Sequence, residues 1–103
     1  MSAPKLTEAQ FQTVVTRLAK AEGWHVFHPR ISQFSEPGWP DLVLVRDRVL
    51  FRELKAQNGR VTEAQLGWIA RLTDAGADVD VWRPADMELI RGTLTRRHLW
   101  EAS

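Results

Sequence analysis

The sequence has no cysteine, no long apolar segment and almost no net charge. The lack of cysteine excludes disulfides, thiolate zinc sites and a cysteine nucleophile, and it is typical of a protein in a reducing cytoplasm. No apolar stretch approaches the roughly 20 residues that a membrane-spanning helix needs, and residues 1–5 do not open a secretory signal. We therefore expect a cytoplasmic protein that does not enter a membrane.

The net charge is +1, from 14 Lys and Arg against 13 Asp and Glu. Binding to nucleic acid cannot be inferred from this total and needs a local basic surface. Of the 103 residues, 44% are hydrophobic and 26% are charged, which is typical of a soluble globular domain. Because this length leaves no room for a second catalytic domain, we interpret residues 1–103 as one domain.

Hydrophobic periodicity predicts an α/β fold with elements in the order α-β-β-β-α-β-α. Capping-box sequences at Thr7 and Thr62 open two helices, which end near Gly23 and Gly76. A last helix follows Asp86, its candidate cap. Strands are predicted over residues 24–28, 42–45, 49–54 and 78–82. Because a helix separates the third and fourth strands, that pair should be parallel and the four-stranded sheet mixed.

The second and third strands form a predicted hairpin around the polar residues 46–48. If its turn is centred on Asp47, Asp41 lies opposite Glu53, with roughly 5 Å between the Cβ atoms. Alternation along the strand places Lys55 on the same face. Two carboxylates this close repel each other unless a cation lies between them. Oxygen ligands of this kind suit Mg²⁺ or Mn²⁺.

These residues match the needs of phosphodiester hydrolysis. That reaction uses a metal to polarise the phosphate and lower the pKa of a bound water, carboxylates to hold the metal, and a cation near the attacking water. Asp41 and Glu53 supply the carboxylates and Lys55 the cation. The backbone carbonyl of Leu54 can complete the shell of a hard cation. The sequence therefore predicts a catalytic metal site at this end of the hairpin.

An alternative is that Glu53 and Lys55 only form a solvated strand face. Val49 and Phe51 share this face, and we expect both to be buried. Ionised side chains beside buried apolar ones are costly unless they have a role. We therefore favour the functional interpretation.

Two further polar residues are candidates, each with an alternative. Glu8 is in phase with the apolar stripe of the first helix and would point inward as a third metal ligand, or it is there because the helix dipole favours an acid in the first turn. Gln65 either pairs with Thr62 in the capping box or faces the site and orients water or phosphate. Glu22 is also in phase with the stripe but lies at the other end of that helix.

Aromatic and histidine side chains near the long loop at residues 29–40 are weaker candidates. His28 can touch a phosphate or relay a proton, although a single histidine is more often structural. Trp39 either stacks on a base or packs against the protein, and we favour packing. Trp68 and Trp82 are expected in or beside the core. Five Trp exceed what this core should need, which favours a homodimer that buries some of them.

Basic residues on the loops and strands around the site predict a rim that contacts a phosphate backbone. They are Arg30, Arg46, Arg48, Arg52, Lys55 and Arg60. The alternative is scattered surface arginine. Among residues outside the catalytic set, we take His28, Arg30, Trp39 and Arg60 as the candidate nucleic-acid contacts. The basic tail at residues 96–98 is a further possibility.

An ordered series of residues runs through most of the chain. It comprises Glu8 and Phe11, Gly23-Trp24, residues 36–45, residues 51–55, Thr62-Glu63-Ala64-Gln65 with Trp68, Gly76, and Val81-Trp82-Arg83-Pro84. This series resembles the PD-(D/E)XK nucleases, and among them the VRR-NUC type found as small stand-alone proteins. The resemblance implies a restriction-endonuclease-like fold in which helices flank the mixed sheet.

The resemblance also implies a metal-dependent endonuclease that hydrolyses DNA. Asp41, Glu53 and the Leu54 carbonyl would hold Mg²⁺ or Mn²⁺, often with an acid matching Glu8. Lys55 would position or activate the water, and Gln65 would line the site. Stand-alone members are similar to homodimers that cut branched DNA such as four-way (Holliday) junctions. We keep two alternatives: a DNA-binding or assembly module with little catalysis of its own, and a nuclease that acts on RNA.

Overall fold

A computed structural model describes residues 5–29 and 36–97. The elements are α1 (Glu8–Ala21), β1 (His25–Phe27), β2 (Leu42–Val45), β3 (Val49–Leu54), α2 (Glu63–Asp74), β4 (Asp78–Trp82), the 3-10 turn η1 (Pro84–Asp86) and α3 (Met87–Thr95). The predicted order of helices and strands is confirmed, with η1 added. No helix of the described part is long and apolar enough to cross a membrane.

The four strands form one mixed sheet in the order β1-β2-β3-β4. The β1–β2 and β2–β3 pairs are antiparallel, whereas β3 and β4 are parallel, as the intervening helix predicted. In the hairpin, Val45 pairs with Val49 and Val43 with Phe51. The predicted turn centred on Asp47 is therefore confirmed, and the register places Asp41 at the level of Glu53.

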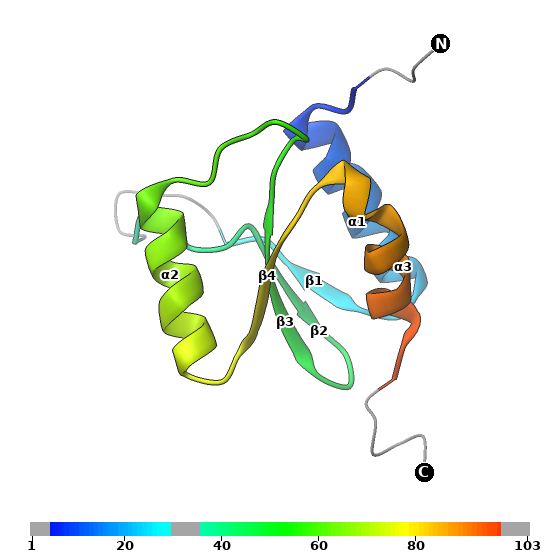
Figure 1. The fold of residues 1–103 in the computed structure, drawn as a ribbon. Helices are drawn as coiled ribbons and strands as arrows, with labels where there is room; N and C mark the ends of the chain where they lie inside the picture. Colours follow the sequence, from blue (N-terminus) through cyan, green and yellow to red (C-terminus); the bar gives the residue numbers. More distant parts are fainter. Residues whose placement is uncertain (1–4, 30–35, 98–103) are drawn as a thin grey trace.

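The core lies on one face of the sheet, where α1 and α3 pack (Figure 1). Leucines of β2 and β3 point into it, and apolar stripes of the two helices cover them. The fully buried core side chains include Leu42, Leu44, Leu50, Leu54, Phe11, Val15 and Ile90. Trp82 is also buried there, as expected, and Trp24 is buried at the end of the core next to the hairpin turn.

The opposite face is covered less completely, because α2 packs mainly against β4 (Figure 1). Phe51 is half-buried, but Val49 is 43% exposed. The expectation that both would be buried is therefore wrong for Val49, which lies near the hairpin turn beyond the cover of α2. On the neighbouring strands Phe27 and Val45 are also exposed, Phe27 by 61%.

Both predicted capping boxes are present, at Thr7 and Thr62. The helices end as predicted, with Gly23 and Gly76 in the left-handed region at φ 88°. Asp86 does not cap α3 through its side chain, which corrects the sequence interpretation. It ends η1 instead, and its carboxylate accepts a hydrogen bond from the backbone N–H of Arg83 at 2.8 Å.

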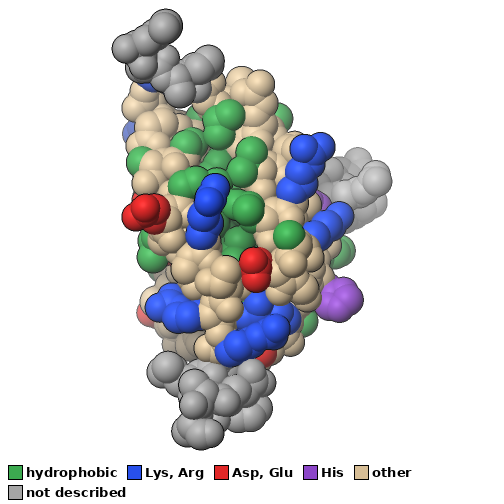
Figure 2. Space-filling view, turned by 90° about the vertical axis from the view of Figure 1, so that its right-hand side faces the viewer, with side chains coloured by type: hydrophobic (Ala, Val, Ile, Leu, Met, Phe, Trp, Pro, Cys, Tyr) green, Lys and Arg blue, Asp and Glu red, His purple; other side chains and the backbone are tan. Residues whose placement is uncertain are grey.

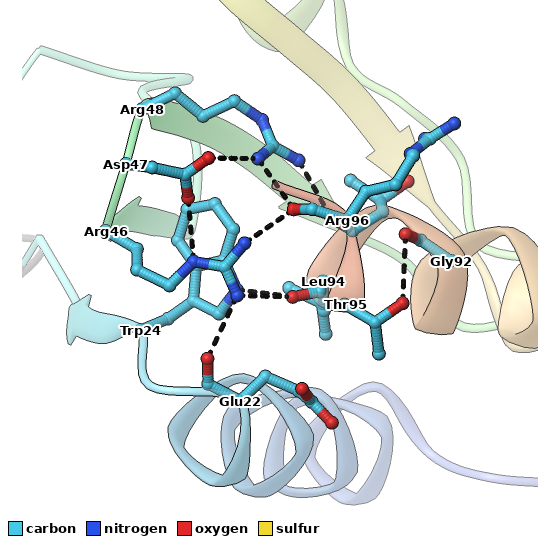
Figure 3. A network of polar contacts seen from close by, with 10 residues as sticks. Glu22, Trp24, Arg46, Asp47, Arg48, Gly92, Leu94, Thr95 and Arg96 are labelled. Atoms are coloured by element: carbon cyan, nitrogen blue, oxygen red, sulfur yellow. Dashed lines mark hydrogen bonds and ion pairs between the residues drawn. The ribbon is translucent and has the colours of Figure 1, made fainter. Parts of the chain in front are cut away.

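The hairpin turn is fastened to the ends of two helices, as Figure 3 shows. Arg46 Nη1 donates to the carbonyls of Leu94 (2.8 Å) and Glu22 (3.0 Å). Arg48 Nη2 donates to the carbonyl of Thr93 at 2.8 Å. Both guanidinium groups lie over the ring of Trp24, 4.4 and 5.1 Å from its centroid. Cations here stabilise the carbonyls at the helix C-termini, of which that of Leu94 also accepts from Trp24 Nε1 at 2.9 Å.

Candidate functional site

Asp41 and Glu53 meet at the end of the hairpin away from its turn, as predicted. Glu53 lies near the end of β3 and is 1% exposed, and Asp41 lies directly before β2. Asp41 Oδ2 accepts a hydrogen bond from the backbone N–H of Leu54 at 2.7 Å. The strand backbone thus fixes one carboxylate beside the other.

The surroundings of Glu53 raise its pKa from 4.5 to about 8. Burial is the largest cause, followed by the charge of Asp41. The Lys55 ammonium acts in the opposite direction, and the charge of Glu8 adds a small rise. Without a bound cation, Glu53 therefore keeps its proton at neutral pH.

Lys55 and Gln65 converge on one oxygen of Glu53. Lys55 Nζ lies 3.7 Å from Glu53 Oε2, and Lys55 is 8% exposed. Gln65 Nε2 donates to the same oxygen at 3.0 Å. Gln65 Oε1 meanwhile accepts from the backbone N–H of Thr62 at 2.9 Å. Gln65 therefore forms the capping box and faces the site at once, through its two amide atoms. Its role in orienting water or phosphate stays a prediction.

The other oxygen of Glu53, Oε1, is buried and has no hydrogen-bond partner among the described residues. A buried acceptor without a donor costs free energy, and a cation would satisfy it. Asp41 adds a second carboxylate, and Leu54 supplies a carbonyl next in sequence to Glu53. Oxygen donors of this kind fit Mg²⁺ or Mn²⁺.

Glu8 begins α1 at the same end of the sheet (Figure 1). Its side chain is exposed, so the expectation that it points inward is wrong. A residue in the first helical turn has no preceding turn to pack against, and the phase of the apolar stripe does not bury it. Within residues 5–29 and 36–97, no three His, Asp or Glu side chains converge as a metal cluster. Its role as a third ligand stays a prediction.

The candidate nucleic-acid contacts lie at separate positions in the structure. His28 is exposed, with Nδ1 2.8 Å from Gln12 Nε2 of α1. Trp39 packs edge-on against Phe51 and Trp68, at centroid distances of 5.9 and 5.0 Å, as we favoured. Arg60 is exposed on the loop before α2. Arg30 lies outside the described residues, as does His98 of the basic tail.

The predicted basic rim is wrong for three of its members. Arg46 and Arg48 lie at the hairpin turn, at the far end of the strands from the site. Arg52 points to the core face, donates to Asp78 at 2.8 Å and lies over Trp82. Alternation along β3 puts it opposite to Glu53. On the face formed by α1 and α3, Lys and Arg side chains are spread among other residues (Figure 2).

Two residues that support the site were missed by sequence reasoning. Arg83 Nη1 donates to the carbonyls of Ala56, Gln57 and Gly59, at 3.0, 3.2 and 2.7 Å, and so holds the loop that follows Lys55. Gly38 has φ 87° and lies against the first turn of α2. Glycine before Trp39-Pro40 was a visible signal for a special backbone conformation. The contacts of Arg83 span 24 to 27 residues and leave no local signal.

Comparison with known proteins identifies the family and the fold. The sequence profile of the VRR-NUC domain matches residues 5–86, a span that includes every predicted site residue. The chain therefore belongs to the VRR-NUC domain family. Among curated proteins, none matches the sequence. A solved structure described as a VRR_NUC domain protein is 27% identical and superposes with a TM-score of 0.70, covering 81% of this chain and 82% of its own.

Proposed function

We propose that this protein is an endonuclease that uses a divalent metal to hydrolyse phosphodiester bonds in DNA. One observation carries the proposal: the buried carboxyl group of Glu53 lies beside the half-buried Asp41 and near the ammonium group of Lys55, and its oxygen Oε1 has no hydrogen-bond partner among the described residues. Such a pair destabilises a fold unless it has a function, and in a nuclease-type domain that function would be metal binding. The family supports DNA as the substrate.

In this proposal, Asp41, Glu53 and the carbonyl of Leu54 would hold Mg²⁺ or Mn²⁺, with Glu8 as a further ligand. The bound ion supplies polarisation of the phosphate and a lower pKa for a coordinated water. Each protein group has its own task. The Leu54 N–H fixes Asp41, and the amide of Gln65 orients the Glu53 carboxylate. Lys55 Nζ donates hydrogen bonds to the attacking water and holds it beside the phosphate.

We also propose that the protein is a homodimer that prefers branched DNA such as four-way junctions. The tryptophan argument for a dimer stays a prediction: Trp24 and Trp82 are buried, Trp39 and Trp68 pack on each other, and Trp100 lies outside the described residues. A different feature supports a dimer: apolar side chains of three adjacent strands are exposed on the face that α2 leaves open. They are Phe27, Val45 and Val49. Sedimentation showing a monomer at micromolar concentration would refute this part.

The deciding experiment incubates the protein with a labelled four-way junction and with linear duplex, in Mg²⁺, Mn²⁺ or EDTA. We expect cuts in both metals, none in EDTA, and more cutting of the junction. A matched single-stranded RNA tests the RNA alternative. Mapping the cut positions on the junction would define the selectivity.

The second candidate function is a DNA-binding or assembly module. The high pKa of Glu53 favours it, because a site that keeps its proton at neutral pH binds metal less readily. The two functions differ in one outcome. Junction binding in a gel-shift assay, with no cleavage in either metal up to pH 9, would support the module and refute the nuclease.

A further inference from the structure

Gly38 lies where a side chain has no room. Its φ is 87°, a conformation that non-glycine residues rarely adopt. A Cβ atom there would lie 2.4 Å from the carbonyl carbon of Ala64 and 2.6 Å from the backbone nitrogen of Gln65. Ordinary contact begins near 3.4 Å, so either the loop or the helix would have to move by about 1 Å. The atoms in the way are backbone, so no side-chain rotation relieves the clash.

The loop around Gly38 is fixed on its other side. Trp39 is wedged between Phe51 of the sheet and Trp68 of α2, and Pro40 is buried. Asp41 follows directly and is bonded to the backbone of β3. The loop is therefore tied to the sheet, whereas no residue of α2 is fully buried. A clash at position 38 displaces the first turn of α2 and not the loop.

We propose that Gly38 is a positioning residue, whose missing side chain lets the first turn of α2 sit close enough for Gln65 to reach Glu53. The Gln65 Nε2 to Glu53 Oε2 distance is 3.0 Å. A displacement of about 1 Å breaks this bond, because hydrogen bonds are lost beyond roughly 3.5 Å. The close approach of Gly38 to α2 thus sets the orientation of the Glu53 carboxylate, although neither Gly38 nor Gln65 is adjacent to Glu53 in the sequence.

The chain offers a matched control for backbone strain. Gly76 has φ 88°, and a Cβ atom there would meet nothing within 4 Å. Gly76→Ala therefore carries the strain of the left-handed conformation without the clash. A difference between Gly38→Ala and Gly76→Ala in the strength of the Gln65–Glu53 hydrogen bond would therefore come from the close approach of position 38 to α2.

The test is hydrogen exchange of the Gln65 side-chain amide, measured by NMR on the full chain. An amide that donates a hydrogen bond exchanges more slowly than a free one. We expect Gly38→Ala and Glu53→Ala each to speed this exchange about tenfold, as the loss of one hydrogen bond predicts. The double variant should add nothing further, and Gly76→Ala should leave the exchange rate unchanged.

The proposal is overturned if the exchange rate in Gly38→Ala matches that in Gly76→Ala, if the exchange slows, or if the effects of Gly38→Ala and Glu53→Ala add. Should alanine at position 38 prevent folding, Gly38→Asn and Gly76→Asn repeat the comparison, because asparagine tolerates positive φ better and has the same Cβ. The inference rests on the proposed function, since Glu53 is singled out there as a metal ligand. The exchange measurement needs no cleavage, however, so faster exchange in Gly38→Ala of a protein that cuts nothing would refute only the nuclease.

Discussion

Replacing Glu53 with glutamine should remove most of the pH dependence of stability in the metal-free protein. The pKa of Glu53 is raised from 4.5 to about 8 in the fold, so between these values the folded state holds a proton that the unfolded state has lost. Stability from this group is then fully present below about pH 4.5 and is lost as the pH rises towards 8. The slope reaches about 1.4 kcal/mol per pH unit, and the whole change is on the order of 5 kcal/mol.

The assay is urea unfolding in EDTA at pH 5, 6, 7 and 8, followed by tryptophan fluorescence. Glutamine cannot ionise and is close in shape to the protonated acid, so the Glu53→Gln curve should be nearly flat over this range. At pH 8 we expect the variant to be more stable than the parent protein. Glu63→Gln, at an exposed position of α2, is the control and should keep the parental slope.

Parallel curves for the parent protein and Glu53→Gln would refute the reasoning. They would mean that Glu53 titrates near its ordinary pKa, and hence that water or a rearranged Asp41 already compensates the buried charge. The proposed need for a cation at this site would then lose its physical basis.

Three further predictions concern the surroundings of the site. Mg²⁺ should bind more tightly at pH 8 than at pH 6 and should release protons on binding, because the ion competes with the proton on Glu53. Calorimetry in two buffers with different ionisation enthalpies measures the number of protons released. Asp41→Asn should abolish the binding. Arg83→Ala should lower the free energy of unfolding by roughly 2 kcal/mol by removing one donor from each of three carbonyls, of which that of Ala56 still accepts from the backbone N–H of Gly59. Arg60→Ala should change the free energy of unfolding by less than about 0.5 kcal/mol. Arg46→Ala should destabilise by an amount similar to that of Arg83→Ala yet leave the NMR-measured pKa of Glu53 unchanged, since the hairpin turn is remote from the carboxylates; Arg17→Ala serves as the exposed control.

The predictions that succeeded rest on local rules. The polar turn between two apolar runs was enough to fix the hairpin register, which in turn brought Asp41 to Glu53. Capping boxes and left-handed glycines set the helix ends in the same way. Each of these signals lies within a few residues of the feature that it specifies.

The predictions that failed concern partners distant in the sequence. The sequence alone gives no means to tell that Arg46 and Arg48 would bind the end of α3, some 45 to 50 residues away. The exposure of Val49 likewise depends on how far α2 extends over the sheet. The role of Gly38 required the distance to the α2 backbone, which no pattern of residue types encodes.

The central claim is that the site cleaves phosphodiester bonds with a metal, and Lys55 tests it most directly. Metal-dependent cleavage of a four-way junction should be measured for the parent protein, Lys55→Ala and Lys20→Ala, after circular dichroism shows that all three are folded. Lys20 is exposed in the last turn of α1, remote from the carboxylates. The account predicts cleavage by the parent and Lys20→Ala and none by Lys55→Ala. Undiminished cleavage by Lys55→Ala would contradict it.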